Sequence, residues 1–222
     1  MENVLYGKIV AMKSRYNLIL LHYLVIFSLM LFPPALSYSQ SLENETPEQV
    51  IHELQATLIQ VMQKGAELGY QGRFNLLAPV VQRSHDLPAI IKAVLGTHWN
   101  KLTEEQHQAI TEMFSKLSIA TYAERFNQYD QERFEFIEKR TLPKDQVLVR
   151  SQLIQADGKA VNFDYVMRQG SNQNWKIINI LADGVSDLAL KRAEYSAIIH
   201  RDGFSALLSQ LEQKIIQAEQ HN

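Results

Sequence analysis

The stretch that decides the fold is residues 147–181, which read VLVRSQLIQADGKAVNFDYVMRQGSNQNWKIINIL. Apolar and polar side chains alternate along three segments of this stretch, which is the period of half-buried strands. An earlier segment around Phe134 and Phe136 shows the same alternation. Asp157-Gly158 is a two-residue hairpin signal, and Gly170-Ser171-Asn172 indicates a second turn. The four segments therefore predict an antiparallel meander.

Helical periodicity flanks the strands on both sides. Thr46-Pro47-Glu48-Gln49 combines a capping hydroxyl with Pro at the first helical position, and Thr103-Glu104-Glu105-Gln106 repeats the capping box. Asp86 can cap a short helix, whereas residues 70–84 show a less regular pattern. Helical spacing returns after residue 188 and again after residue 203.

The order of helices, strands and helices, without an internal repeat, predicts one α+β domain over residues 46–219. A single antiparallel sheet must bury one face, and the helices must bury their apolar stripes, so we expect the two to pack together. The expected shape is a cone, in which a curved antiparallel sheet of about four strands packs against the N- and C-terminal helices. Its interior is either core or cavity.

Composition excludes several classes of protein. The 222 residues contain no cysteine, so thiolate zinc sites, iron–sulfur clusters and cysteine nucleophiles are absent. The formal net charge of −2 offers no basic surface for nucleic acid. A mean hydropathy of −0.19 excludes a protein with many membrane spans.

Residues 1–37 have the organisation of a secretory signal peptide. A basic start precedes the apolar run LILLHYLVIFSLMLF at residues 18–32, and Pro33-Pro34 and small residues follow it. Cleavage after Ser37 or Ser39 is expected, and cleavage after Ser37 changes the formal charge from −2 to −4 because three bases and one acid leave. The alternative is an uncleaved N-terminal anchor, since the run is close to the lower length limit for a spanning helix.

Motifs for catalysis or metal binding are weak. The histidines form no HExxH or other close ligand pair, and the chain has neither a P-loop nor GxGxxG. Gly184-Val185-Ser186 begins like a nucleophile elbow but lacks the closing glycine. Asp164 and Tyr165 resemble an acid–base pair, but neighbours on a strand point to opposite faces. We therefore expect no metal, no cofactor and no catalysis, with an isomerase or dehydratase of conical fold as the alternative.

Apolar and aromatic side chains of the sheet and helices are directed at one interior. A packed core and a cavity for acyl chains use the same residue types, so composition leaves both possibilities open. The residues expected to line such a pocket are Trp99, Phe114, Leu117, Tyr122, Val147, Val149, Leu153, Phe163, Tyr165, Val185, Tyr195 and Ile199.

Several stretches resemble the MlaC, or toluene-tolerance, family of periplasmic lipid-binding proteins. They occur in family order from about Thr46 to Ile216, nearly the whole expected mature chain. The similar segments are Val94-Leu95-Gly96-Thr97-His98-Trp99, Leu102-Thr103-Glu104-Glu105-Gln106, Thr121-Tyr122-Ala123, Asn174-Trp175-Lys176-Ile177-Ile178, Asp183-Gly184-Val185-Ser186 and Gly203-Phe204.

Within that family, residues 121–126, Tyr129, residues 132–135 and residues 186–195 are most similar to HpnM, the hopanoid-associated branch. The phospholipid-shuttle branch typically has Asn-Tyr-Arg after Gly-Val-Ser, whereas this chain has Leu190-Lys191-Arg192 and retains only the arginine. The departure leaves a phospholipid, a hopanoid or another polycyclic lipid open as the ligand.

The resemblance implies an NTF2-like fold and a periplasmic lipid carrier without chemistry of its own. It also implies an inner-membrane ABC lipid transporter as partner, and an outer-membrane lipoprotein complex as a further one. Trp99, Tyr122 and Arg192 are expected at the pocket mouth, with Arg192 as a headgroup contact. The alternatives are an NTF2-like enzyme acting on an apolar substrate of hopanoid metabolism, or a membrane-anchored adaptor.

Overall fold

The computed structural model describes residues 45–220, so the predicted leader lies outside the described residues. In chain order the elements are α2 (Pro47–Gln63), α3 (Gly65–Ser84), α4 (Leu87–Leu95), the 3-10 helix η1 (Gly96–Lys101), α5 (Glu104–Arg125), β1 (Arg133–Leu142), β2 (Gln146–Ile154), β3 (Ala160–Gln169), β4 (Trp175–Ala182), β5 (Val185–Ser186), α6 (Asp187–Asp202) and α7 (Phe204–Gln220). This order confirms the predicted α+β class. Within the described range, no helix has both the length and the apolar character needed to cross a bilayer.

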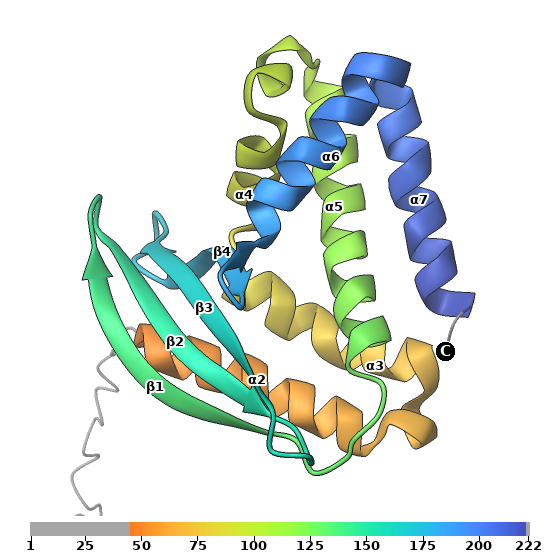
Figure 1. The fold of residues 1–222 in the computed structure, drawn as a ribbon. Coiled ribbons are helices and arrows are strands. Elements are labelled where there is room, and N and C mark those ends of the chain that lie inside the picture. The colour runs from red at the N-terminus through yellow and green to blue at the C-terminus, as the bar shows by residue number, and fades with distance from the viewer. Residues whose placement is uncertain (1–44, 221–222) are drawn as a thin grey trace, which may run out of the picture. The chain divides into compact units, whose positions relative to one another are not determined.

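The strands form one antiparallel sheet in the order β1-β2-β3-β4-β5 (Figure 1). The sheet is the predicted meander with one strand more, because Val185 and Ser186 pair with the end of β4. The turn at Asp157-Gly158 is longer than the predicted two-residue loop. Gly158 adopts φ 83°, and the Gln155 N–H donates to the Lys159 carbonyl at 2.8 Å. Gly158 follows the turn in the left-handed conformation, which brings Lys159 back into pairing with Gln155. The loop therefore has one residue more than the predicted two-residue hairpin.

Helix α2 packs against the inner face of the curved sheet (Figure 1). Both halves of the predicted capping box form at its start, between Thr46 and Gln49. Its apolar stripe, which includes Leu54 and Leu58, is buried. From the same face the amide of Gln55, itself buried, donates to the Ser151 hydroxyl at 2.6 Å. This hydrogen bond fixes the helix against β2 without leaving a buried polar group unpaired.

Helix α3 occupies the region whose pattern was predicted to be less regular. It bends at Gly69, whose φ of 57° is not helical, and it contains Pro79. These two residues break the 3.6-residue pattern that a straight amphipathic helix shows. Its Arg73 is buried and donates to the backbone carbonyls of Ala123 and Gly65, both at 2.9 Å. Arg73 therefore connects α3 to the end of α5.

Helix α5 is central to the helical layer, where it contacts α3, α4 and α7 (Figure 1). Its buried face contains Ile110, Phe114 and Leu117. Helices α6 and α7 pack on each other, and α6 also contacts α4 and β4. The helices therefore meet the sheet through α2, α3, α4 and α6, each of which contacts β4.

The edge strand β1 is more exposed than the alternation predicted. Phe136 was expected to be half-buried, but 58% of it is exposed. The register with β2 shifts between Phe136 and Glu138, and such a bulge bends an edge strand and re-aims its side chains. Phe134, before the bulge, packs with its ring 6.2 Å from that of Phe163.

The junction of α2 and α3 leaves no room for a side chain at Gly65. A Cβ added there would lie 2.0 Å from the backbone carbonyl oxygen of Asn127. Gly65→Ala should therefore lower the free energy of unfolding by about 2 kcal/mol, measured by urea denaturation. Gly170→Ala is the control, because its nearest neighbour is the movable Asn172 side chain at 3.3 Å. Equal stability of the two variants would contradict the close contact.

Candidate functional site

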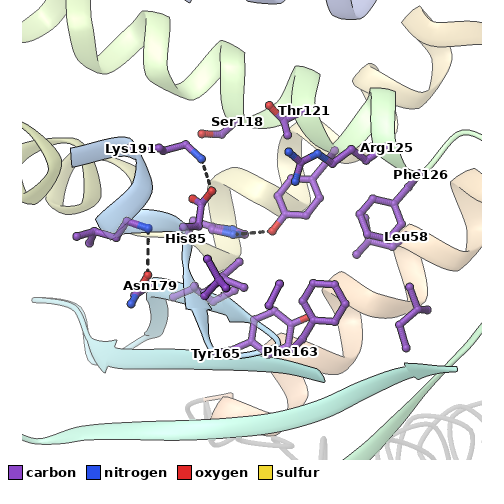
Figure 2. Close-up of a pocket in the computed structure, with 18 of the residues that line it drawn as sticks. Leu58, His85, Ser118, Thr121, Arg125, Phe126, Phe163, Tyr165, Asn179 and Lys191 are labelled. Carbon is purple, nitrogen blue, oxygen red and sulfur yellow. Dashed lines mark hydrogen bonds and ion pairs between the residues drawn. The ribbon is translucent and has the colours of Figure 1, made fainter. Parts of the chain in front are cut away.

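A cavity of about 590 Å³ lies between the sheet and helices α2, α4, α5 and α6. Figure 2 shows Leu58, Phe126, Phe163 and Tyr165 projecting around it from the helices and the sheet. Its apolar wall consists of Leu58, Met62, Leu87, Ile90, Phe114, Phe126, Leu153, Phe163, Ile177, Ile180, Ala182, Val185, Leu188 and Leu190. A wall of this chemistry suits an apolar ligand.

Secondary-structure periodicity places these side chains. On β3, Phe163 and Tyr165 are two residues apart, so both point to the same side of the sheet. On α5 the lining positions are three or four residues apart, so they form one helix face. That face comprises Phe114, Ser118, Thr121, Tyr122 and Arg125.

A buried histidine lies in the cavity wall at the end of α3. The Asp86 N–H donates to the Ile177 carbonyl at 2.9 Å, which holds this end of the helix against β4. His85 Nδ1 is 3.1 Å from the Val81 carbonyl oxygen, which can only accept, and 2.9 Å from the Ser84 hydroxyl, which donates its own hydrogen to the Val80 carbonyl at 2.7 Å. This pattern assigns the hydrogen to Nδ1. His85 Nε2 therefore accepts from the Tyr122 hydroxyl at 3.1 Å (Figure 2).

Burial keeps the polar groups of this wall neutral. It lowers the pKa of His85 to about 4, because the charged imidazolium loses its hydration. For the same reason it raises the pKa of Tyr122 well above its ordinary value and that of Tyr165 to about 12. At neutral pH this part of the cavity therefore carries no charge from these three groups.

The hydroxyl groups in the wall already have partners within the protein. Ser118 and Thr121 donate to backbone carbonyls one turn earlier, both at 2.8 Å. The Tyr165 hydroxyl accepts from the Gln55 amide at 3.3 Å. An apolar ligand can therefore fill this space without leaving these groups unpaired.

Charged side chains gather at one side of the cavity, between α5 and α6. Arg125, Asp187 and Lys191 line it there, and the Lys191 ammonium forms an ion pair with Asp187 (Figure 2). A second cavity, of about 330 Å³, lies on the other side of these residues against α7. Thr121, Arg125, Asp187, Leu190 and Lys191 line both cavities.

Six of the residues predicted to line a pocket lie together around the larger cavity, and the others lie elsewhere in the structure. The six that line the larger cavity are Phe114, Tyr122, Leu153, Phe163, Tyr165 and Val185. Leu117 and Tyr195 line the smaller cavity. Val149 is in the packed core, and Val147 and Ile199 pack against that core while partly buried.

Two of the three residues expected at the mouth make other contacts. The Trp99 ring stacks on the imidazole of His107 at 4.0 Å between centroids, in the corner between η1 and α5. The Arg192 guanidinium donates to the backbone carbonyl of Ala93, which connects α6 to α4. Arg192 therefore has a structural partner at the position where a headgroup contact was predicted, while Tyr122 lines the cavity.

Several lining residues were not among the predicted ones. Leu58 and Met62 belong to the apolar stripe of α2, so their helical spacing was a signal for burial, although not for a cavity. His85 lay in no motif, and Arg125 lay in the segment 121–126 that resembles the hopanoid-associated branch but was assigned no role there. Their roles arise from contacts between distant segments. Among the described residues, no group of three His, Asp or Glu side chains could hold a metal ion.

Comparison with known proteins gives consistent matches. Residues 52–213 match the sequence profile of the family described as MlaC protein. The intermembrane phospholipid transport system binding protein MlaC of Haemophilus influenzae is 24% identical over 127 residues, which are 56% of this chain and 59% of that protein. The match thus spans less than two thirds of that relative.

A solved structure has a similar fold. It is the phospholipid-binding protein from Ralstonia solanacearum in complex with a phospholipid, with a TM-score of 0.66 and 23% identity, covering 77% of this chain and 95% of that one. At this identity the likeness establishes the fold alone.

The buried histidine makes stability depend on pH. Between pH 6.5 and about 4 the unfolded chain binds a proton at His85 that the folded chain does not, so stability falls as pH falls through this window. The shift corresponds to roughly 3 kcal/mol of unfolding free energy. We expect NMR to show the Nδ1–H tautomer at pH 7 and protonation near pH 4. Protonation near pH 6.5 would contradict this account, and His85→Asn should remove this part of the pH dependence.

Proposed function

We propose, from the premise that this chain belongs to the MlaC family, that it is a lipid carrier which holds lipid tails in the larger cavity and moves them between membranes. The observation that carries the proposal is the apolar cavity of about 590 Å³ between the sheet and the helices. Small-molecule pockets fall in the range of about 300–1,000 Å³, so the volume suits a ligand of that size.

The energetics of hydrocarbon burial support this role. Each CH₂ group removed from water contributes about 0.8 kcal/mol, so an acyl chain of ordinary length gains on the order of 10 kcal/mol. The polar groups of the inner wall are satisfied by His85–Tyr122 and Gln55–Tyr165 contacts, so they do not oppose hydrocarbon. Binding then needs no chemistry beyond the exclusion of water.

The ligand class is a membrane lipid, either a phospholipid or a hopanoid. The Ralstonia solanacearum structure of the same fold holds a phospholipid. The similarity of residues 186–195 to the hopanoid-associated branch keeps a hopanoid or another polycyclic lipid open as the ligand. A phospholipid and a polycyclic lipid each have a large apolar part that suits the apolar wall of the cavity.

The proposed location is the periplasm, reached through the leader at residues 1–37. A mature chain of charge −4 is weakly repelled by anionic membrane surfaces, which favours delivery through a protein partner over direct adsorption. The name of the Haemophilus influenzae relative places that protein in an intermembrane phospholipid transport system. The proposed partners here are an inner-membrane ABC lipid transporter and an outer-membrane lipoprotein complex.

A second candidate is an enzyme of the same fold that acts on an apolar substrate. One observation favours it, namely that His85 places an ionisable group in the cavity wall. A histidine with a pKa of about 4 is a weak base, and its Nε2 already accepts from Tyr122, so the carrier is the better reading. Tyr122→Phe separates the two, because a carrier keeps lipid uptake whereas an enzyme using this pair loses turnover.

Lipid occupancy is the direct test. Organic extracts of the exported protein should contain a lipid by mass spectrometry, and delipidated protein should take lipid up from liposomes. Ser118→Phe puts a ring into the cavity and should reduce uptake about tenfold or more.

A matched control is available on the same helix. Ser115→Phe removes an equivalent hydrogen bond, from Ser115 to the Thr111 carbonyl at 2.8 Å, but Ser115 lines neither cavity. It should therefore leave uptake unchanged. A protein without lipid and without uptake would overturn the carrier, and equal loss in both variants would show that the cavity is not the binding site.

The fate of the leader can be read from the exported protein. N-terminal sequencing should find a start at Tyr38 or Gln40 in the soluble fraction, because the small residues before these positions fit a cleavage site. An intact Met1 in the membrane fraction would instead support the anchored adaptor.

A further inference from the structure

The two cavities share a wall between α5 and α6 that carries charged side chains, whereas most of the larger cavity is lined by apolar ones. On one side of it lies the apolar cavity, and on the other side lies the smaller cavity, whose lining includes Glu124, Glu194 and Lys214. The cationic side chains that line the larger cavity, Arg125 and Lys191, both belong to this wall, so the wall is the side of that cavity with chemistry for the anionic end of a lipid. The wall consists of Thr121 and Arg125 from α5, and Asp187, Leu190 and Lys191 from α6.

The cationic side chains around this wall differ in whether they form an ion pair with a carboxylate. The Lys191 ammonium is paired with Asp187, one helical turn earlier, and the Lys214 ammonium is paired with Glu194 across α6 and α7. Among the residues that the structure describes, Arg125 is the cation lining these cavities that has no ion pair with a carboxylate. Glu132, which also lines the larger cavity, accepts from the Asp130 N–H at 2.5 Å and forms no ion pair with Arg125 among the described residues. An anion can therefore bind Arg125 without displacing an internal partner.

The position of Arg125 fits such a role. It is in the last turn of α5, is exposed to solvent, and lines both cavities. Figure 2 shows the Arg125 and Lys191 side chains reaching toward the same side of the cavity from different helices. A planar guanidinium can donate two parallel hydrogen bonds to a phosphate or carboxylate, which a single ammonium cannot.

We propose that Arg125 binds the anionic group of the carried amphiphile, a phosphate or a carboxylate, while the tails occupy the larger cavity. This inference rests on the proposed function and narrows its ligand class to anionic or phosphate-bearing amphiphiles. It also moves the headgroup contact from Arg192, which holds the Ala93 carbonyl, to Arg125.

The test compares ligands that share tails but differ in charge. Isothermal titration calorimetry would use dioctanoyl phosphatidylglycerol against dioctanoylglycerol, and palmitate against hexadecanol, so that phosphate and carboxylate are tested separately. Arg125→Gln should weaken binding of the anionic member of at least one pair about tenfold, which is about 1.4 kcal/mol, and change binding of its neutral partner less than about twofold. Arg125→Glu should weaken the anionic member further, because it adds repulsion.

Arg201→Gln is the matched control, since Arg201 is exposed on α6, pairs with Asp202 and lines neither cavity. It should change no affinity. Equal weakening of charged and neutral ligands by Arg125→Gln, or no weakening at all, would overturn the role of Arg125 while leaving the carrier intact. A wild-type chain that binds none of the four ligands would overturn the proposed anionic ligand class, whereas the carrier itself is overturned by the absence of lipid from organic extracts and of uptake from liposomes.

Discussion

The apolar face of an antiparallel sheet must be covered by other elements. Here helices cover it, but they leave a cavity between themselves and the sheet. Helices α2 and α6 both contact the sheet directly, α2 on β2 and β4 and α6 on β4, while α5 faces the sheet across the cavity. Away from the cavity, Leu54 and Met167 are fully buried in the packed core. The remaining volume, about 590 Å³, retains an apolar wall because it is built from the same stripes that elsewhere form core. The site is thus a consequence of how far apart two layers are held.

Polar groups within the wall maintain this arrangement without opposing an apolar ligand. Gln55 bonds to Ser151 and Tyr165 beneath α2, and His85 bonds to Tyr122 between α3 and α5. Each connects elements that are far apart in sequence, and burial shifts the pKa values of His85 and Tyr165 so that both side chains are neutral at pH 7. In a low dielectric an unpaired polar group costs free energy. These hydrogen bonds therefore favour the one packing of the segments in which both groups are paired. The cations of the larger cavity, Arg125 and Lys191, both lie in the wall between α5 and α6, whereas its carboxylates are Asp187 in that wall and Glu132 just before β1.

Much of the fold could be predicted from the sequence, because strand alternation, capping boxes and turn residues are local signals. The capping boxes at Thr46 and Thr103 and the period of two along β2 and β3 all correspond to elements in the structure. Prediction was weakest for α3, where Gly69 and Pro79 interrupt the helical period, and for β1, where a bulge exposes Phe136. The family resemblance added the lipid-carrier hypothesis, which periodicity alone could not supply.

The candidate site was only partly accessible to the same reasoning. Sequence determined that certain residues face inward, because the direction of a side chain follows from its position in a strand or helix. It could not separate Phe163, which lines the cavity, from Val149, which is in the core, since both are apolar and inward-facing. That distinction depends on the distance between layers. Likewise, only the tertiary structure decided that Arg192 holds a backbone carbonyl whereas Arg125 lies between two cavities, because a charge acquires its role from partners that other segments bring to it.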